Sequence, residues 1–339
     1  MKHGPHAPHT GTPARRPGSV RRTTSHTCLR PDGLFGNVHV AAHARDIWTG
    51  AGRHHEIVGE AGVEAVVAFI EDRSLRSITV DPPAPLLDKL AGVKVSSGFR
   101  RAIDEAMPAD EESGSLRVQL LDDLPTAVLV SGVAMAGAGV HPPRGSIDIS
   151  SKADICAGWA TGGSFLVEGE RLGHLPSVTG PIAPGLQSSD GDSLAWHPVE
   201  EMTPHSTRRR RRIDVWRDAD ARGGTGSVMV EEFFRDTQLD GEGVERVVHE
   251  YLVTAELEPE SLTFLSCRAD IGVLPWVECP AAAESAARLT GTKPHDLRER
   301  VRQTFVGTST CTHLNDSLRA LAALSYLVSV VDAGGRIRR

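Results

Sequence analysis

The sequence predicts an α+β protein made of two tandem repeats, each an antiparallel sheet followed by helices. The first observation is an internal echo: residues 243–251 read Gly-Val-Glu-Arg-Val-Val-His-Glu-Tyr, and residues 62–70 read Gly-Val-Glu-Ala-Val-Val-Ala-Phe-Ile. The second is a shift of 190 residues at which other positions agree: Arg21-Arg22 with Arg211-Arg212, Gly36 with Gly226, and Arg45-Asp46 with Arg235-Asp236. Self-similarity of this kind is typical of a repeated unit. In each copy strand-like alternation precedes helical periodicity, which favours the α+β class.

Composition divides the chain into four parts. Residues 1–19 hold histidines among Pro, Gly and Arg, with too few apolar side chains to order a core, and are expected to form a disordered tail. The first repeat spans residues 20–165, an irregular linker spans 166–207, and the second repeat spans 208–332. We expect the repeats to pack about a pseudo-two-fold axis as an internal pseudo-dimer.

The second repeat has the clearest secondary-structure patterns. In residues 249–257 polar and apolar positions alternate, as in a half-buried antiparallel strand that places His249 and Tyr251 on one face. A later helix is predicted by an apolar stripe at helical spacing, formed by Leu314, Leu318 and Leu321. A further match, at a shift of 199 residues, pairs residues 90–94 with 289–293.

Bulk properties exclude several classes of function. A net charge of -7 makes a general nucleic-acid or anionic-membrane binder unfavourable. There is no run of about 18 apolar residues that would span a membrane, and no secretory signal is visible. Five cysteines, an odd number, argue against a disulfide framework and favour a reducing, cytoplasmic location.

Several short motifs carry a resemblance to a known family. Arg211-Arg212, Cys279-Pro280, Leu289-x-Gly291 and Cys311-Thr312-His313-Leu314 resemble the bacterial family called domain of unknown function 2889. Its members typically carry one such unit, with a Cys-Pro and a later Gly-Cys-Thr-His-Leu, and here Thr310 stands in place of that Gly. The resemblance covers roughly residues 15–165 and 205–330 and implies no established activity.

The order of features in the second repeat is also similar to NifU/IscU-type scaffolds, which have a SufE/NifU-like fold and hold iron–sulfur clusters. The places of their ligands and turn fall on His249, Cys279, Gly291-x-Lys293, and Cys311 with His313. The sequence departs from the scaffold pattern in two ways, because His249 stands near the place of the first cysteine and Thr312 separates the final cysteine from its histidine. The resemblance implies a metal site at these residues.

The candidate site residues are therefore His249, Cys279, Cys311 and His313. Thiolates and imidazoles suit zinc, and thiolates also hold iron–sulfur clusters. Both cysteines are expected near helix N-termini, where the helix dipole would lower the thiol pKa. If Ser309 or Thr310 caps the last helix, however, His313 points away from Cys311.

Comparison of the two copies favours a functional site in the second. The first copy has Ala68 opposite His249, residues 81–83 (Asp-Pro-Pro) opposite Cys279, and Ser113 and Ser115 opposite Cys311 and His313. Ligands of one site would be lost as a set, so the first repeat is interpreted as a structural half. The competing interpretation is that the cysteines are small buried hydrophobic residues and His249 a core residue bonded to a backbone carbonyl.

Three classes of function remain open at this point. The site binds zinc or an iron–sulfur species, or it belongs to an enzyme in which zinc polarises a substrate or Cys311 is a nucleophile with a histidine base, or the protein is a metal-free interaction module. The five arginines at 208–212 are interpreted as a solvated strand entry rather than a phosphate patch. Substrate, partners and further oligomerisation are not indicated by the sequence.

Overall fold

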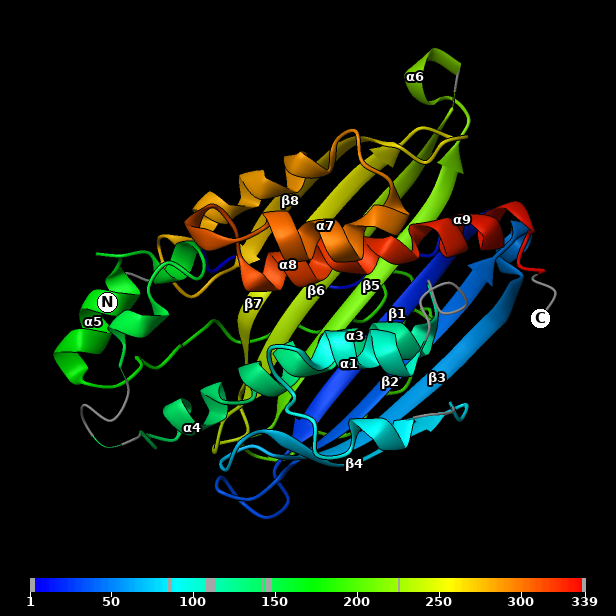
Figure 1. Cartoon of the computed structure of the whole chain (residues 1–339). Helices are drawn as coiled ribbons and strands as arrows, with labels where there is room; N and C mark the ends of the chain where they lie inside the picture. Colours follow the sequence, from blue (N-terminus) through cyan, green and yellow to red (C-terminus); the bar gives the residue numbers. More distant parts are fainter. Residues whose placement is uncertain are drawn as a thin grey trace.

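The protein, described here from a computed structural model, is one eight-stranded antiparallel sheet with helices packed on one face (Figure 1). The structure describes residues 4–84, 87–107, 114–141, 143, 148–224 and 226–336. The strands are β1 (Ser19–Leu29), β2 (Val38–Thr49), β3 (His55–Ala68), β4 (Ser74–Asp81), β5 (Thr207–Asp218), β6 (Ser227–Leu239), β7 (Glu245–Leu257) and β8 (Phe264–Val273). The predicted mixture of antiparallel strands and helices is confirmed.

The described helices follow the strands of each half. After β4 come α1 (Phe99–Ala106), α3 (Leu116–Val130), α4 (Val133–Gly137) and α5 (Ser164–Leu172), and α6 (Ala221–Gly224) lies between β5 and β6. After β8 come the 3-10 helix η5 (Cys279–Leu289) and the helices α7 (Leu297–Thr304), α8 (Thr312–Ala320) and α9 (Leu324–Asp332). In Figure 1, α3 crosses the sheet beside the α8–α9 pair.

The strand order is β4-β3-β2-β1-β5-β6-β7-β8. From each edge to the centre, the sheet therefore has the fourth, third, second and first strand of one half. The two central strands, β1 and β5, pair antiparallel, with Ser19 opposite Trp216 and Thr24 opposite Arg211. The two predicted repeats therefore contribute their strands to one continuous sheet.

The strand register corrects the internal echo. In the first half Arg45 lies opposite Glu60 and Asp46 opposite Gly59. In the second half Arg235 lies opposite Glu250 and Asp236 opposite His249. The residue that occupies the place of His249 is thus Gly59, and the predicted pairing with Ala68 is wrong.

The error in the echo has a physical cause. Val-Val runs suit either face of a strand, so a short match between two such runs can slip, and an odd slip moves every side chain to the other face. The residues matched by the shift of 190, Arg45-Asp46 and Arg235-Asp236, share one feature: a register irregularity directly follows each aspartate, at Asp46/Ile47 and at Asp236/Thr237. The match of Arg21-Arg22 with Arg211-Arg212 is wrong: Arg22 pairs with Asp46, and Arg209 pairs with Asp236.

The residues matched by the shift of 199, 90–94 and 289–293, contain the same kind of turn. The Gly92 N–H donates to Leu75 O, and the Gly291 N–H donates to Phe264 O, both at 2.8 Å. Both glycines have left-handed backbone conformations, with φ of 79° and 81°. A side chain would be strained at this φ, so glycine is required at both turns.

The helix face of the sheet holds the apolar core. Leu314, Leu318 and Leu321 are fully buried there, as their spacing predicts. Two helical stretches, Leu116–Gly137 and Thr312–Asp332, are long and apolar enough to span a membrane, but 67% and 78% of their apolar windows are buried in the fold. Packing against the sheet accounts for their composition. Ile149, Ala157 and Phe165 pack into the core under the second-half strands, although the sequence assigns them to the first repeat.

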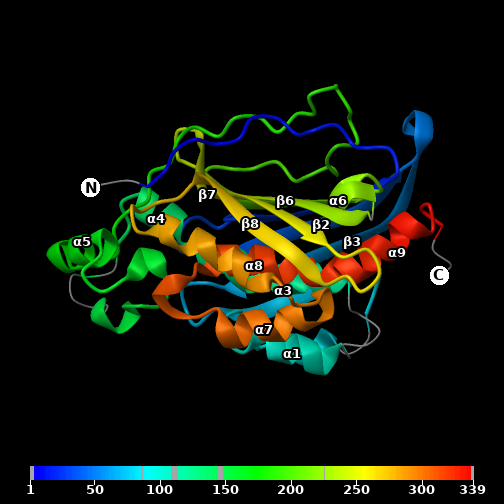
Figure 2. The ribbon, with the colours of Figure 1, turned by 90° about the horizontal axis from the view of Figure 1, so that it is seen from above.

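The other face of the sheet is covered by extended segments rather than helices (Figure 2). Residues 4–18, expected as part of a disordered tail, lie along the sheet and the linker, with the Ala7 N–H donating to Gly272 O at 2.9 Å and Thr12 paired with Ser188. Arg15 also forms an ion pair with Asp192, 2.7 Å apart. Backbone pairing needs no apolar side chains, so composition gave no sign of this order. The linker adds a similar contact, the Val247 N–H donating to Pro181 O at 2.9 Å.

His197 of the linker is buried on this second face. Its Nδ1 is 2.8 Å from Thr23 Oγ1 and its Nε2 is 2.7 Å from Ser25 Oγ. Burial, reinforced by the charges of Arg45, His43, Arg210 and His26, lowers the pKa of His197 to about 3.

We expect this histidine to weaken the fold on the acid side of neutrality. Below about pH 6.5 the unfolded chain takes up a proton at His197 that the folded chain excludes, so stability is lost as pH falls toward the folded pKa. The loss attributable to His197 is about 1 kcal/mol between pH 6.5 and 5.5. Urea unfolding at both pH values should show a smaller acid loss in His197→Gln than in the wild type, and equal losses would contradict the prediction.

Candidate metal centre

The structure brings the four predicted residues to one end of the helix face. His249 lies on β7 and points, like Tyr251, toward the helices. Cys311 is the N-cap residue of α8, and His313 is in the first turn of that helix. Cys279 begins η5. Because Cys311 itself is the cap, neither Ser309 nor Thr310 caps the helix, and His313 Nδ1 lies 3.8 Å from Cys311 Sγ.

The residues that converge most closely are His249, His313 and Asp236 of β6. One ligand atom from each lies within 4.8 Å of the other two. His249 Nδ1 is 3.5 Å from Asp236 Oδ2, and the two imidazole rings are stacked with centroids 3.6 Å apart. His249 Nδ1 and His313 Nε2 are buried without a hydrogen bond. This carboxylate and these two nitrogens are the donors that could hold a metal ion.

The charge state of the cluster suits a cation. Burial, and then the charge of His249, lowers the pKa of His313 to about 3, which leaves a neutral imidazole with a free lone pair. Burial alone would raise the pKa of Asp236, but Arg209 holds it well below its usual range. Arg209 donates to both Asp236 oxygens, at 2.9 and 3.0 Å, and each oxygen keeps a second lone pair.

The cysteines form a neighbouring group that does not join the ligand cluster. Ala157 N–H donates to Thr310 O at 2.9 Å, which brings Cys156 toward Cys311, and a Cβ on Gly158 would lie 2.6 Å from Cys279 Sγ. Among the described residues the three-ligand group contains neither Cys279 nor Cys311.

The predicted lowering of the thiol pKa is also wrong. Burial raises the pKa of Cys279 and of Cys311, and with the neighbouring Cys311 it raises the pKa of Cys156 to about 12. Removal from water outweighs the helix N-terminus at these positions, because a thiolate loses more from desolvation than the helix dipole returns. These thiols are protonated at neutral pH.

Asp236 is the ligand candidate that the sequence search missed. Arg235-Asp236 matches Arg45-Asp46, and a pair that occurs in both halves does not by itself indicate a site in one of them. In the first half no described histidine lies beside Asp46, because Gly59 takes the place of His249. Ser113, predicted opposite Cys311, lies outside the described residues.

Arginines of α1 and α7 each form an ion pair with a helix of the opposite half. Arg100 of α1 reaches Asp316 of the other half, and Arg298 of α7 reaches Asp122, both at 3.2 Å. Arg100 also lies 3.3 Å from Asp122 of its own half, so these arginines and carboxylates join the helices of the two halves.

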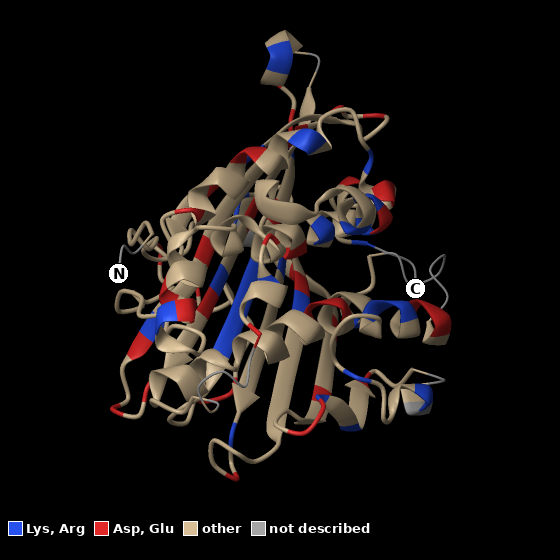
Figure 3. Cartoon of the chain, turned by 60° about the vertical axis from the view of Figure 1, so that its left-hand side comes forward, with Lys and Arg blue, Asp and Glu red and all other residues tan. Residues whose placement is uncertain are grey.

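The arginines at 208–212 form the centre of the molecule. They lie on β5, in the middle of the sheet, and four of them are buried, so the predicted solvated strand entry is wrong. Figure 3 shows their blue band along the central strands, with acidic residues beside it. Alternation along the strand sends Arg209 and Arg211 to the helix face and Arg208, Arg210 and Arg212 to the other.

On the helix face the arginines are matched by carboxylates from several elements. Arg209 Nη1 is 2.8 Å from Asp316 Oδ2, in addition to its contact with Asp236. Arg211 Nη1 is 2.6 Å from Glu232 Oε1, and its Nη2 is 3.0 Å from Asp123 Oδ1. This network joins both halves and borders the metal-ligand cluster through Asp236.

Comparison with known proteins bears on the second half of the chain. Residues 207–326 match the model of a family described as Protein of unknown function (DUF2889), in agreement with the resemblance of residues 205–330. No curated protein and no solved structure matches the chain significantly. The matched residues include Asp236, His249 and His313.

Proposed function

We propose that the chain binds one divalent transition-metal ion, with zinc as the best fit, through Asp236, His249 and His313. The proposal rests on the convergence of these three side chains. One buried nitrogen of each histidine also lacks a hydrogen bond. Zinc bonds to nitrogen and oxygen are about 2.0–2.2 Å long, so ligand atoms on one ion lie roughly 3.5 Å apart. The separation of 3.5 Å between His249 Nδ1 and Asp236 Oδ2 supports this spacing.

The free nitrogens assign a role to each histidine. His313 offers Nε2, while its Nδ1 lies near Cys311 Sγ and 3.5 Å from Thr312 Oγ1. Metal-bound histidines commonly use their second nitrogen to contact an orienting group. Cys311 is then a neighbour that orients the ligand. The two rings are within 19° of parallel, and an ion lies in the plane of each ring that binds it, so binding tilts one ring out of the stack.

The burial of the site favours a structural ion. Asp236 is 1% exposed and His249 is 8% exposed, which leaves little access for a substrate. The ion would join β6, β7 and α8, three elements that otherwise meet here through a stacked ring pair and Arg209. Thiol catalysis is less well supported, because Cys311 is protonated and 5% exposed.

We further propose that the chain is a duplicated unit in which the second half alone has the site. The symmetric strand order, the matched register irregularities and the paired glycine turns support duplication. The competing ligand set follows the pattern of NifU-type scaffolds. In that set, Cys279 and Cys311 of this chain would hold zinc or an iron–sulfur cluster. All five cysteines are free, in keeping with the proposed cytoplasmic location.

Metal content of purified variants tests the proposal. We expect about one zinc per wild-type chain after dialysis. His249→Gln and His313→Gln each remove a ligand, so each should lower the zinc affinity by more than the 10–100-fold typical of residues that only orient a ligand. A chelator should lower the Tm of the wild type toward that of these variants, since an ion bound only to the native state stabilises it. His197→Gln, a buried histidine on the other face, is the matched control and should keep its zinc.

A second pair of variants separates the two ligand sets. Cys279→Ser with Cys311→Ser should retain zinc, and a cobalt-loaded wild type should lack a thiolate-to-cobalt charge-transfer band. Loss of metal in the double cysteine variant, with retention in His249→Gln, would favour the NifU-type set instead. A wild type that binds no zinc at micromolar concentration would contradict the set formed by Asp236, His249 and His313.

A further inference from the structure

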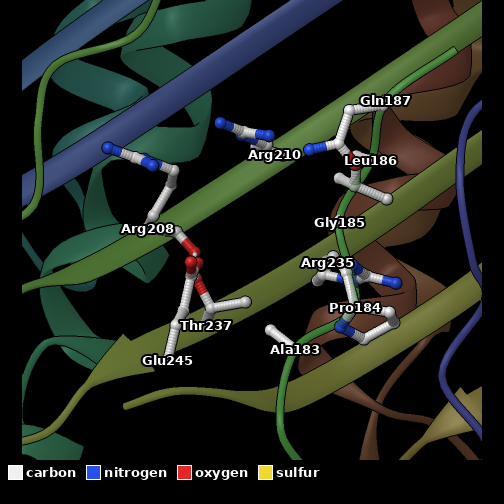
Figure 4. A pocket seen from close by; sticks show the side chains of 10 residues that line it. All are labelled: Ala183, Pro184, Gly185, Leu186, Gln187, Arg208, Arg210, Arg235, Thr237 and Glu245. Carbon is white, nitrogen blue, oxygen red and sulfur yellow. Dashed lines mark hydrogen bonds between the residues drawn. The ribbon is translucent and has the colours of Figure 1, made fainter. Parts of the chain in front are cut away.

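The second face of the sheet has a pocket of 220 Å³ between the linker and β5–β7 (Figure 4). It exceeds the roughly 150 Å³ cavity that accommodates benzene. Arg208, Arg210 and Arg235 approach it from the sheet, and Pro184, Leu186 and Gln187 approach it from the linker. The space therefore suits a small molecule, with polar groups on one wall and apolar atoms on the other.

Two of the three guanidinium groups are held in place by the protein. Arg235 pairs with Glu250 and donates from Nη1 to Pro184 O at 2.8 Å. Arg208 donates from Nε to Thr27 Oγ1 at 3.2 Å and also donates to Glu200 O. These contacts fix both guanidinium groups without filling the pocket, a form of preorganisation that favours binding.

Arg210 is the group left for a ligand. The described residues place no carboxylate at ion-pair distance from it, and its Nε is buried without a hydrogen bond. Its guanidinium lies 5.6 Å from the centre of the Trp196 ring, and Gln187 lies beside it in Figure 4. A half-buried arginine whose Nε is buried without a hydrogen bond, and which has no carboxylate at ion-pair distance, is unfavourable unless an anion approaches it.

The charges in the pocket favour an anion. Arg235 is offset by Glu250, and among the residues that line the pocket Arg208 and Arg210 then face one carboxylate, that of Glu245. Glu245 accepts a hydrogen bond from Thr237 Oγ1 at 2.5 Å. Burial, followed by the charge of Arg208, lowers the pKa of Arg210 to about 10. The guanidinium therefore remains charged at neutral pH, although its surroundings disfavour that charge. The excess of one positive charge matches a monoanionic head group.

We propose that this pocket binds a small organic anion whose carboxylate or phosphate group lies against Arg208 and Arg210 and whose body lies against Pro184 and Leu186. Planar guanidinium groups bind carboxylates and phosphates through paired hydrogen bonds. The pocket is on the opposite face of the sheet from the metal-ligand cluster, so this binding is independent of the proposed ion.

Calorimetric titration with inorganic phosphate and with sodium propionate, each in chloride buffer of constant ionic strength, tests the proposal. We expect the wild type to bind at least one of the two, and the stronger binder identifies the head group. Arg210→Gln should weaken binding roughly tenfold or more, since it removes a charge-assisted contact. Arg217→Gln, on the same strand but paired with the exposed Asp332, is the matched control and should bind as the wild type does.

A second variant guards against misfolding of Arg210→Gln. Gln187 is exposed, so Gln187→Glu should fold normally, and its carboxylate would occupy Arg210 and weaken anion binding by a similar factor. The proposal is overturned if the wild type binds neither anion beyond the chloride reference. It is also overturned if Gln187→Glu binds as tightly as the wild type.

Discussion

Arg211→Leu is expected to destabilise the protein by about 3–5 kcal/mol, the cost typical of breaking a buried ion pair from one side. Arg211 is fully buried between Glu232 and Asp123, which come from β6 and α3. Removal of the guanidinium takes the charge partner from the fully buried Glu232 and leaves Asp123 with Arg209, 3.9 Å away. Burial already raises the pKa of Glu232, so loss of its partner drives that carboxyl further toward the protonated form. Urea unfolding at pH 7 measures the loss.

Two further variants are controls for Arg211→Leu. Arg217→Gln breaks the exposed pair with Asp332 and should cost less than about 1 kcal/mol. The triple variant Arg211→Leu, Asp123→Leu, Glu232→Leu removes the whole buried group and should recover much of the loss, because buried ion pairs can be replaced by apolar side chains at little cost. If Arg211→Leu alone were as stable as the wild type, the network would have no role in the stability of the fold.

The arginine network also shows where sequence reasoning reached its limit. Five consecutive arginines are most often solvated, and nothing local in the sequence indicates that Thr207–Asp218 is the central strand. The carboxylates that balance them are distant, with Asp123 88 residues before Arg211 and Asp316 107 residues after Arg209. Pairing of β1 with β5 is also a contact of high sequence separation, which periodicity alone does not predict.

Local features were predictable for a corresponding reason. The alternation that places His249 and Tyr251 on one face of β7, and the leucine stripe of α8, depend only on strand and helix periods. The repeated glycine turn needed only a left-handed residue at Gly92 and Gly291. The candidate site was predicted as a region from the resemblance carried by Cys279, Cys311 and His313 and from the comparison of the two copies. Asp236 could be found only once the register placed it opposite His249.

The second large effect is expected at Gly180, where the linker lies against β7. A Cβ built on this glycine would lie 1.6 Å from Val247 O, a backbone atom that cannot move without disturbing the strand. Nearby, the Val247 N–H donates to Pro181 O and Ile182 pairs with Arg246, so Gly180→Ala would push this segment away from β7. The expected loss of stability is about 1–3 kcal/mol, as for other insertions of atoms into packed regions.

Alanine at a second glycine, Gly62, is expected to change stability in the opposite direction. Gly62 lies within β3, and a Cβ there would meet its nearest atom, Ala42 O, at 3.8 Å, which is ordinary contact. Glycine in a strand interior costs roughly 0.5–1 kcal/mol relative to alanine, so Gly62→Ala should leave stability unchanged or raise it. Thermal unfolding of both variants measures the difference. Because residues 183–187 come shortly after Gly180 and line the arginine pocket, Gly180→Ala should also weaken anion binding, whereas Gly62→Ala should not. Equal stability of the two variants would mean that the linker is not held against β7 as the structure has it.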